Sequence, residues 1–202
     1  MVPNKSLFVH VGGPRGVGKS SVLNHMSQTV TIGLPLVVMP ASAFVIELGM
    51  ERFARSWGEL TVAEKGEMRK AFVEHLKQFC QGVYVLDSHY VDVLPVGKVQ
   101  SIIPIELYPL IGCHVVIDCS VNALLARRKS DIAKKRSLNK RHIERERHGE
   151  LAVAQRVARE TGTPFHVVPN EQDVEYAAEC LGGIIKARWR HILPSLPPTP
   201  PK

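Results

Sequence analysis

Short runs of apolar and β-branched residues alternate along the chain with longer segments in which apolar residues recur every three or four positions. The short runs predict β-strands, at residues 6–11, 36–39, 83–87, 113–119 and 164–168. The longer segments predict helices. One helix begins near residue 19, and the others are expected at residues 41–49, 61–82, 102–110, 121–128, 152–161 and 174–189. Strands and helices that alternate in this way are typical of a parallel sheet covered by helices on both faces. The pattern therefore predicts an α/β fold in three layers, α/β/α.

A glycine-rich turn joins the first predicted strand to the first predicted helix. It reads GPRGVGKS and fits the pattern G-x-x-x-x-G-K-S/T, the phosphate-binding loop of P-loop NTPases. Glycines let the turn bring its N–H groups against phosphate oxygens, and the start of the helix adds its own free N–H groups. A glycine-rich turn with a surface lysine is the alternative, but the flanking strand and helix favour a nucleotide site. We therefore expect ATP and Mg²⁺ as cofactors, held by Gly13, Pro14, Arg15, Gly16, Val17, Gly18, Lys19, Ser20 and Ser21.

Two residues of this turn carry the chemistry. Lys19 is expected to contact the β- and γ-phosphates, and the hydroxyl of Ser20 is expected to reach Mg²⁺. A third candidate is Asp87, because four apolar residues followed by an acid resemble a Walker B strand, whose acid orients the metal. An aspartate that caps the next turn is the alternative. Since the carboxyl ends of parallel strands line the ligand crevice, we favour a role for Asp87 in binding Mg²⁺ or substrate, with His89 at the same edge.

Composition limits the class of protein. The chain has 202 residues, of which 45% are hydrophobic and 22% charged, and this is ordinary for one globular domain. We expect a single domain over residues 1–192 and a proline-rich tail without fixed structure over 193–202. No apolar run is long enough to span a membrane, and the first residues lack the apolar core of a signal peptide. The expected location is therefore cytoplasmic.

The net charge of +7, with a pI near 9.4, favours anionic partners such as nucleotides and also allows nucleic acid. Much of this charge lies in one basic segment, residues 127–147, which resembles a lid. Most charge runs are simply solvated surfaces, and that reading stays open beside the lid. The four cysteines are far apart and form no metal-binding spacing, so reduced thiols are expected.

The order of these motifs resembles that of archaeal-type adenylate kinases, which are P-loop nucleoside monophosphate kinases. The likeness covers most of residues 6–190 and is carried by the P-loop, a Leu-Gly pair at 48–49 before a long helix, D-S-H at 87–89, A-R-R-K-S-D at 126–131 and K-K-R at 134–136. It implies a five-stranded parallel sheet in the order 2-3-1-4-5. It also implies phosphoryl transfer from MgATP to a nucleoside monophosphate and allows a homo-oligomer.

The resemblance gives roles to individual residues. Arg128 and Arg136 fall where the family's lid arginines clamp phosphates, and Arg127 lies close by and is expected to bind ATP. With Lys19 and Asp87, Arg128 and Arg136 are therefore the expected catalytic residues. Arginines that close over MgATP suit a reaction that depends on positioning and charge neutralisation.

The acceptor side departs from the family. The residues after His89 lack the family's Pro- and Gly-rich stretch, and Gly58 stands where the family has an arginine. Arg52 and Arg55 lie nearby, so with His89 they are the candidate substrate-binding residues. Two other functions stay open: a regulatory or nucleic-acid-associated ATPase, and a nucleotide-binding protein of kinase fold without turnover.

Overall fold

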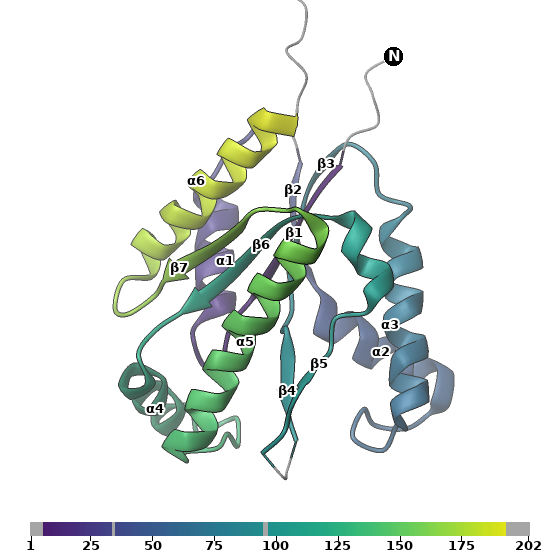
Figure 1. Cartoon of the computed structure of the whole chain (residues 1–202), viewed down its shortest axis with the longest axis vertical. Helices are drawn as coiled ribbons and strands as arrows, with labels where there is room; N and C mark the ends of the chain where they lie inside the picture. Colours follow the sequence, from purple (N-terminus) through teal and green to yellow (C-terminus); the bar gives the residue numbers. More distant parts are fainter. Residues whose placement is uncertain (1–5, 34, 95–96, 193–202) are drawn as a thin grey trace, which may run out of the picture.

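The computed structural model describes residues 6–33, 35–94 and 97–192 (Figure 1). The strands are β1 (Ser6–Gly12), β2 (Leu36–Pro40), β3 (Gly82–Asp87), β4 (Val91–Val93), β5 (Val99–Ser101), β6 (Ile111–Asp118) and β7 (Phe165–Pro169). The helices are α1 (Lys19–Thr29), α2 (Ala41–Phe53), α3 (Val62–Leu76), the 3₁₀ turn η1 (Ile105–Leu110), α4 (Val121–Ser130), α5 (Lys140–Thr161) and α6 (Val174–Ile192). The expected tail, residues 193–202, lies outside the described residues.

The main sheet contains five parallel strands in the order β2-β3-β1-β6-β7. Because β4 and β5 form a separate antiparallel hairpin, this order is 2-3-1-4-5 when only the strands of the main sheet are counted. The predicted fold class and strand order are therefore confirmed. All five strands run the same way, so their carboxyl ends meet at one edge, the lower edge in Figure 1.

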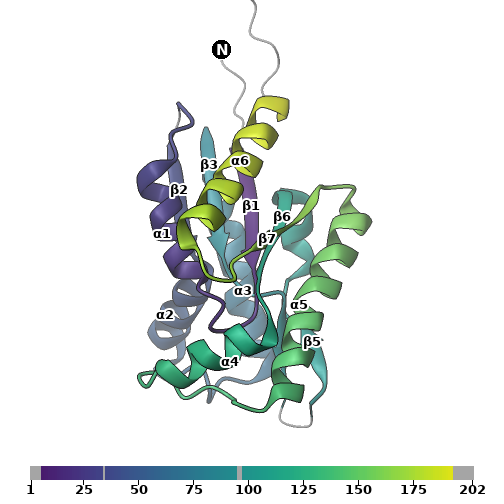
Figure 2. The same ribbon diagram turned by 90° about the vertical axis from the view of Figure 1, so that its left-hand side faces the viewer.

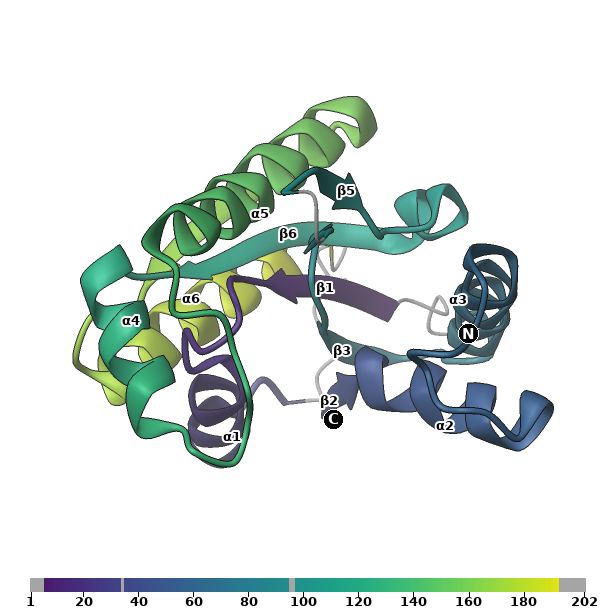
Figure 3. The same ribbon diagram turned by 90° about the horizontal axis from the view of Figure 1, so that it is seen from below.

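Helices cover both faces of the sheet, as the two turned views show (Figures 2 and 3). Along β1, Leu7 and Val9 point into a core formed with α1 and α6. Phe8, between them, points to the opposite face and packs with residues of α2 and α3. Helix α5 covers β6 on this second face, where Val116 packs against Ala154. Alternation along the strands thus produces the three layers.

Several elements differ from the sequence prediction. Helix α3 ends at Leu76 and not at Gly82, where β3 begins. Helix α5 begins at Lys140, well before residue 152, because Asn139 caps it by accepting the N–H of His142. The basic segment 127–147 is consequently not one continuous loop: its ends are helical, and residues 131–139 connect them. Helix α2 continues past Gly49 to Phe53. The β4–β5 hairpin was not expected at all.

Candidate active site

The P-loop takes the conformation that its glycines allow. Gly13, Gly16 and Gly18 have φ angles of 144°, 87° and 91°, which residues other than glycine rarely adopt. A Cβ at Gly13 would lie 2.3 Å from the carbonyl oxygen of Ile117, so the loop also passes too close to β6 for any larger residue. The loop leads directly into α1, which starts at Lys19. Its N–H groups and the helix start therefore share one space.

That space is a cavity of about 520 Å³, here called the P-loop cavity. The Nζ atom of Lys19 lies 3.7 Å from Oδ1 of Asp87 and 3.4 Å from Nε2 of His89. Burial lowers the pKa of Lys19, and the nearby carboxylates of Asp87 and Glu150 offset only part of this effect. Other lining residues come from the P-loop, from α2 and from the α4–α5 connection, among them Ser20, Ser42, Arg127, Asp131, Lys134 and Arg136.

The residues present fit a magnesium ion. Ser20 and Asp87 both line the P-loop cavity and supply hydroxyl and carboxylate oxygens. Mg²⁺ is commonly held by one or two protein ligands together with substrate phosphates and water. Among the residues that the structure describes, no cluster of three or more His, Cys, Asp or Glu could hold a metal on its own.

Two glutamates of α5 hold the P-loop from behind. Glu150 accepts the N–H of Gly13 at 2.9 Å, and Glu146 accepts the N–H of Arg15 at 2.8 Å. Both carboxylates are almost fully buried. Glu150 also contacts Nδ1 of His89 at 3.2 Å and so couples the loop to the end of β3. The shape of the P-loop is therefore fixed by helix α5 and not by the loop sequence alone.

The predicted lid arginines divide into two groups. Arg128 is only 4% exposed; its Nε donates to the carbonyl oxygen of Arg15 at 2.9 Å and its terminal nitrogen pairs with Glu146 at 2.6 Å. Arg127 donates to the carbonyl oxygen of Val17 at 2.8 Å while lining the cavity. Arg136 lies in the cavity wall and pairs with Asp131 at 2.5 Å. In this conformation Arg128 supports the loop, whereas Arg127 and Arg136 face the nucleotide space.

A second cavity, of about 480 Å³, lies beside the first and is here called the α3 cavity. The sheet closes it at His10 and Leu86, α2 and α3 form one side, and the segment from β3 to η1 forms the other. Arg15, Ser42 and His89 line both cavities. A ligand in each would therefore meet at these three side chains.

Arg15 spans the boundary between the cavities. Its guanidinium pairs with Glu146 of α5 and with Asp92 of the β4–β5 hairpin. Burial lowers the pKa of Arg15, but the charges of Glu146 and Asp92 and their hydrogen bonds outweigh this, so its pKa is raised and the side chain stays cationic. A fixed positive charge thus stands where the two cavities join.

The structure does not bring Arg52 and Arg55 to either cavity. Arg52 pairs with Glu67 at 3.3 Å, and Arg55 pairs with Glu64; both arginine side chains are exposed. Helix α2 continues past Gly49, and this places Arg52 in its last turn, on the outside of the α2–α3 pair. The cations of α3 that do line the α3 cavity are Lys65 and Arg69.

Sequence reasoning missed the two glutamates that hold the P-loop. Neither Glu146 nor Glu150 is among the predicted site residues. A signal was available: Ile143, Glu146, Glu150 and Ala154 recur at three- and four-residue steps, which places them on one helical face. Charged residues on an otherwise apolar face indicate buried partners.

Among the solved structures that share this fold are two shikimate kinases. Shikimate kinase from Bacteroides thetaiotaomicron matches with a TM-score of 0.55 at 13% identity, over 89% of this chain and 98% of that chain. Shikimate kinase from Acinetobacter baumannii, in complex with shikimate, matches with a TM-score of 0.54 at 13% identity, over 95% of this chain and 97% of that one. At this identity the likeness shows the fold alone.

Comparison of sequences adds no family: no family model and no curated protein matches the chain. The resemblance to archaeal-type adenylate kinases therefore stays a prediction. Within the described residues, no helix is long and apolar enough to cross a membrane.

Proposed function

We propose that the protein is a kinase that transfers the γ-phosphoryl group of MgATP to a small acceptor. The observation that supports this proposal is the pair of adjoining cavities with Arg15, Ser42 and His89 in both linings. A P-loop ATPase needs one nucleotide cavity and a water molecule. A kinase needs a second cavity whose ligand reaches the γ-phosphate, and the α3 cavity supplies that space.

The residues then take the following roles. Lys19 contacts the β- and γ-phosphates, while Ser20 and Asp87 hold the magnesium ion that neutralises them. Arg136 adds positive charge from the α4–α5 connection. Arg15 stands where the transferring group would pass, and a preorganised cation there stabilises developing charge without reorganisation.

For the acceptor, the motif order favours a nucleoside monophosphate, with His89 in contact with it. The fold also accommodates other acceptors, since one of the solved neighbours is in complex with shikimate. Both classes belong in a first screen. A cytoplasmic location and a homo-oligomer are further parts of the proposal.

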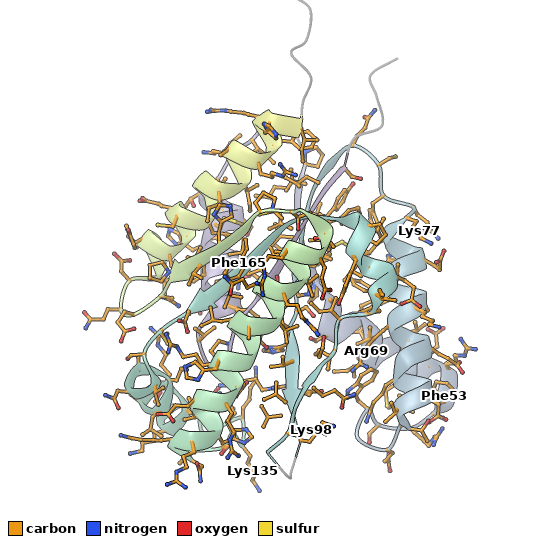
Figure 4. The ribbon with its side chains drawn as sticks, in the orientation of Figure 1. Phe53, Arg69, Lys77, Lys98, Lys135 and Phe165 are labelled. Atoms are coloured by element: carbon orange, nitrogen blue, oxygen red, sulfur yellow. The ribbon has the colours of Figure 1, made fainter. Side chains whose placement is uncertain are left out.

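The decisive experiment is a coupled assay of ADP release with MgATP and a panel of nucleoside monophosphates, nucleosides and shikimate. We expect ADP formation that depends on one acceptor and is abolished in Lys19→Ala. Lys77→Ala is the matched control, because Lys77 lies on the outside of the molecule, where it pairs with Glu74 (Figure 4). ADP release that no acceptor stimulates, yet is lost in Lys19→Ala, would refute the kinase and identify an ATPase.

A second candidate is a nucleic-acid-associated ATPase. It is favoured by exposed lysines at and near the P-loop cavity, namely Lys129, Lys134 and Lys135. For this function, RNA or DNA should stimulate ADP release, and binding should weaken steeply as salt rises. Stimulation by nucleic acid without any small acceptor would favour it over the kinase.

A further inference from the structure

The α3 cavity has two cations stacked over one aromatic ring. Nζ of Lys65 and Cζ of Arg69 each lie 5.7 Å from the ring centroid of Trp57. Lys65 and Arg69 are four residues apart on α3, so they are neighbours on its surface. Like charges at this spacing destabilise a helix. All three side chains line the cavity.

Neither cation has an acidic partner among the residues that the structure describes. The ion pairs made by α3 itself use Glu64, Glu67, Lys70 and Glu74 and leave Lys65 and Arg69 out. The carboxylate that acts on Arg69 is Asp92, which is already paired with Arg15. Burial lowers the pKa of Arg69, and Asp92 opposes this effect only in part. A cation in this position is stabilised by an anion that enters the cavity.

Trp57 lies away from Ser42, one of the residues at which the cavities join. Ser42, at the start of α2, lines both cavities. Trp57 packs against Gly49 of the same helix, since a Cβ there would lie 3.8 Å from its Cε3 atom. Seven residues of helix separate Ser42 from Gly49, which is about 10 Å along the axis. Figure 4 shows Arg69 reaching from α3 toward the β4–β5 hairpin.

We propose that Trp57, Lys65 and Arg69 form a site for an anionic group of the acceptor, a carboxylate or a phosphate, that is separate from the oxygen receiving the phosphoryl group. The acceptor class is thus a small anion that also carries a hydroxyl. The inference depends on the proposed function only in naming this ligand the acceptor. A nucleoside monophosphate would use its own phosphate at the junction of the cavities, and its neutral base would face the cations.

Binding can be measured without ATP from the fluorescence of Trp57. The probes are three matched pairs: salicylate and salicylamide, glycerol phosphate and glycerol, AMP and adenosine. We expect salicylate or glycerol phosphate to change the emission of the wild type and not that of Trp57→Phe, with its neutral counterpart binding about tenfold more weakly or worse. Binding of the carboxylate alone or of the phosphate alone identifies the anion.

Arg69→Gln should weaken this binding about tenfold or more, because a charge-assisted hydrogen bond is lost. Lys70→Gln is the matched control, since Lys70 is the next residue of α3 and pairs with Glu106 on the outside. Equal binding by Arg69→Gln and the wild type, or neutral compounds that bind as tightly as their anions, would overturn the proposal. Arg69-dependent binding of AMP with conversion to ADP would also overturn it, because the anion would then be the reacting phosphate.

The stability of Arg69→Gln in the absence of ligand distinguishes a binding role of Arg69 from a structural role. An arginine kept for a ligand contributes little to folding, so Arg69→Gln should resist urea as well as the wild type or better. A clear loss of stability would indicate a structural role and would contradict the inference. Anion titration and the ADP assay, both on the wild type, separate the two proposals: anion binding without acceptor-dependent ADP release refutes the kinase alone, and ADP release without anion binding refutes this site alone.

Discussion

The buried ion pair behind the P-loop gives a quantitative prediction. Arg128 and Glu146 have side chains that are each 1% exposed, and their closest atoms lie 2.6 Å apart. Glu146→Ala would leave the guanidinium of Arg128 buried without a counter-charge. Breaking such a pair from one side costs about 3–5 kcal/mol, a large part of the 5–15 kcal/mol that stabilises a typical domain. The N–H of Arg15 would lose its acceptor as well.

Urea unfolding followed by far-UV circular dichroism would measure this cost. Glu144→Ala is the matched control, because Glu144 is an exposed acid on the same helix, and its loss should change the unfolding free energy by no more than about 0.5 kcal/mol. The double variant Arg128→Met/Glu146→Leu leaves no buried charge unpaired, so its cost should fall well below the sum of the single changes. Equal effects of Glu146→Ala and Glu144→Ala, or strictly additive costs in the double variant, would refute the reasoning.

The same pair gives a pH dependence. Burial raises the pKa of Glu146, but hydrogen bonds from Arg128 and from the N–H of Arg15, with the charges of both arginines, lower it more, so the net pKa is reduced. A carboxylate with a reduced pKa stabilises the fold above its unfolded pKa, which is about 4.3. This contribution is lost as pH falls through the folded value. The difference in unfolding free energy between the wild type and Glu146→Ala should therefore shrink in acid.

Two further substitutions test the P-loop and the α4–α5 connection. Gly12→Ala would place a Cβ 2.2 Å from the ring of Tyr90 and 2.8 Å from Oε2 of Glu150; we expect a loss of about 1–3 kcal/mol in urea unfolding, and an unchanged midpoint would show that the ring can move aside. Arg136→Met removes a cation from the P-loop cavity whose partner, Asp131, is itself partly exposed. Acceptor-dependent ADP release should fall at least about tenfold, while the urea midpoint stays close to that of the wild type; a normal rate would exclude Arg136 from the reaction.

The sequence predicted those parts of the fold that depend on local pattern. The five strands of the sheet, the P-loop and the start of the long helix near residue 61 could be read from neighbouring residues, and the structure contains them. The β4–β5 hairpin could not, because strands of three residues show no periodicity. The ion-pair partners of Arg15 could not be predicted either, because they are far away in sequence.

In the candidate site, too, the sequence predicted some features and missed others. Lys19 and Asp87 each belong to a motif of their own, and the meeting of strand ends at one edge of the sheet predicted that they lie close together. Arg128 carries the correct charge at the correct position in the motif, but its partner is a glutamate of the following helix. A motif specifies which residue types are present, and only the tertiary contacts decide whether an arginine faces a ligand or a carboxylate. Their roles in catalysis remain predictions.

The hydrogen bonds from α5 to the back of the P-loop have a consequence for nucleotide binding. Ordering a loop costs about 1–2 kcal/mol of backbone entropy per residue. Since Glu150 and Glu146 of the fold itself accept the N–H groups of Gly13 and Arg15, part of that entropy is lost when the chain folds and does not oppose ATP binding. The P-loop therefore has the shape that binds phosphates before the nucleotide arrives.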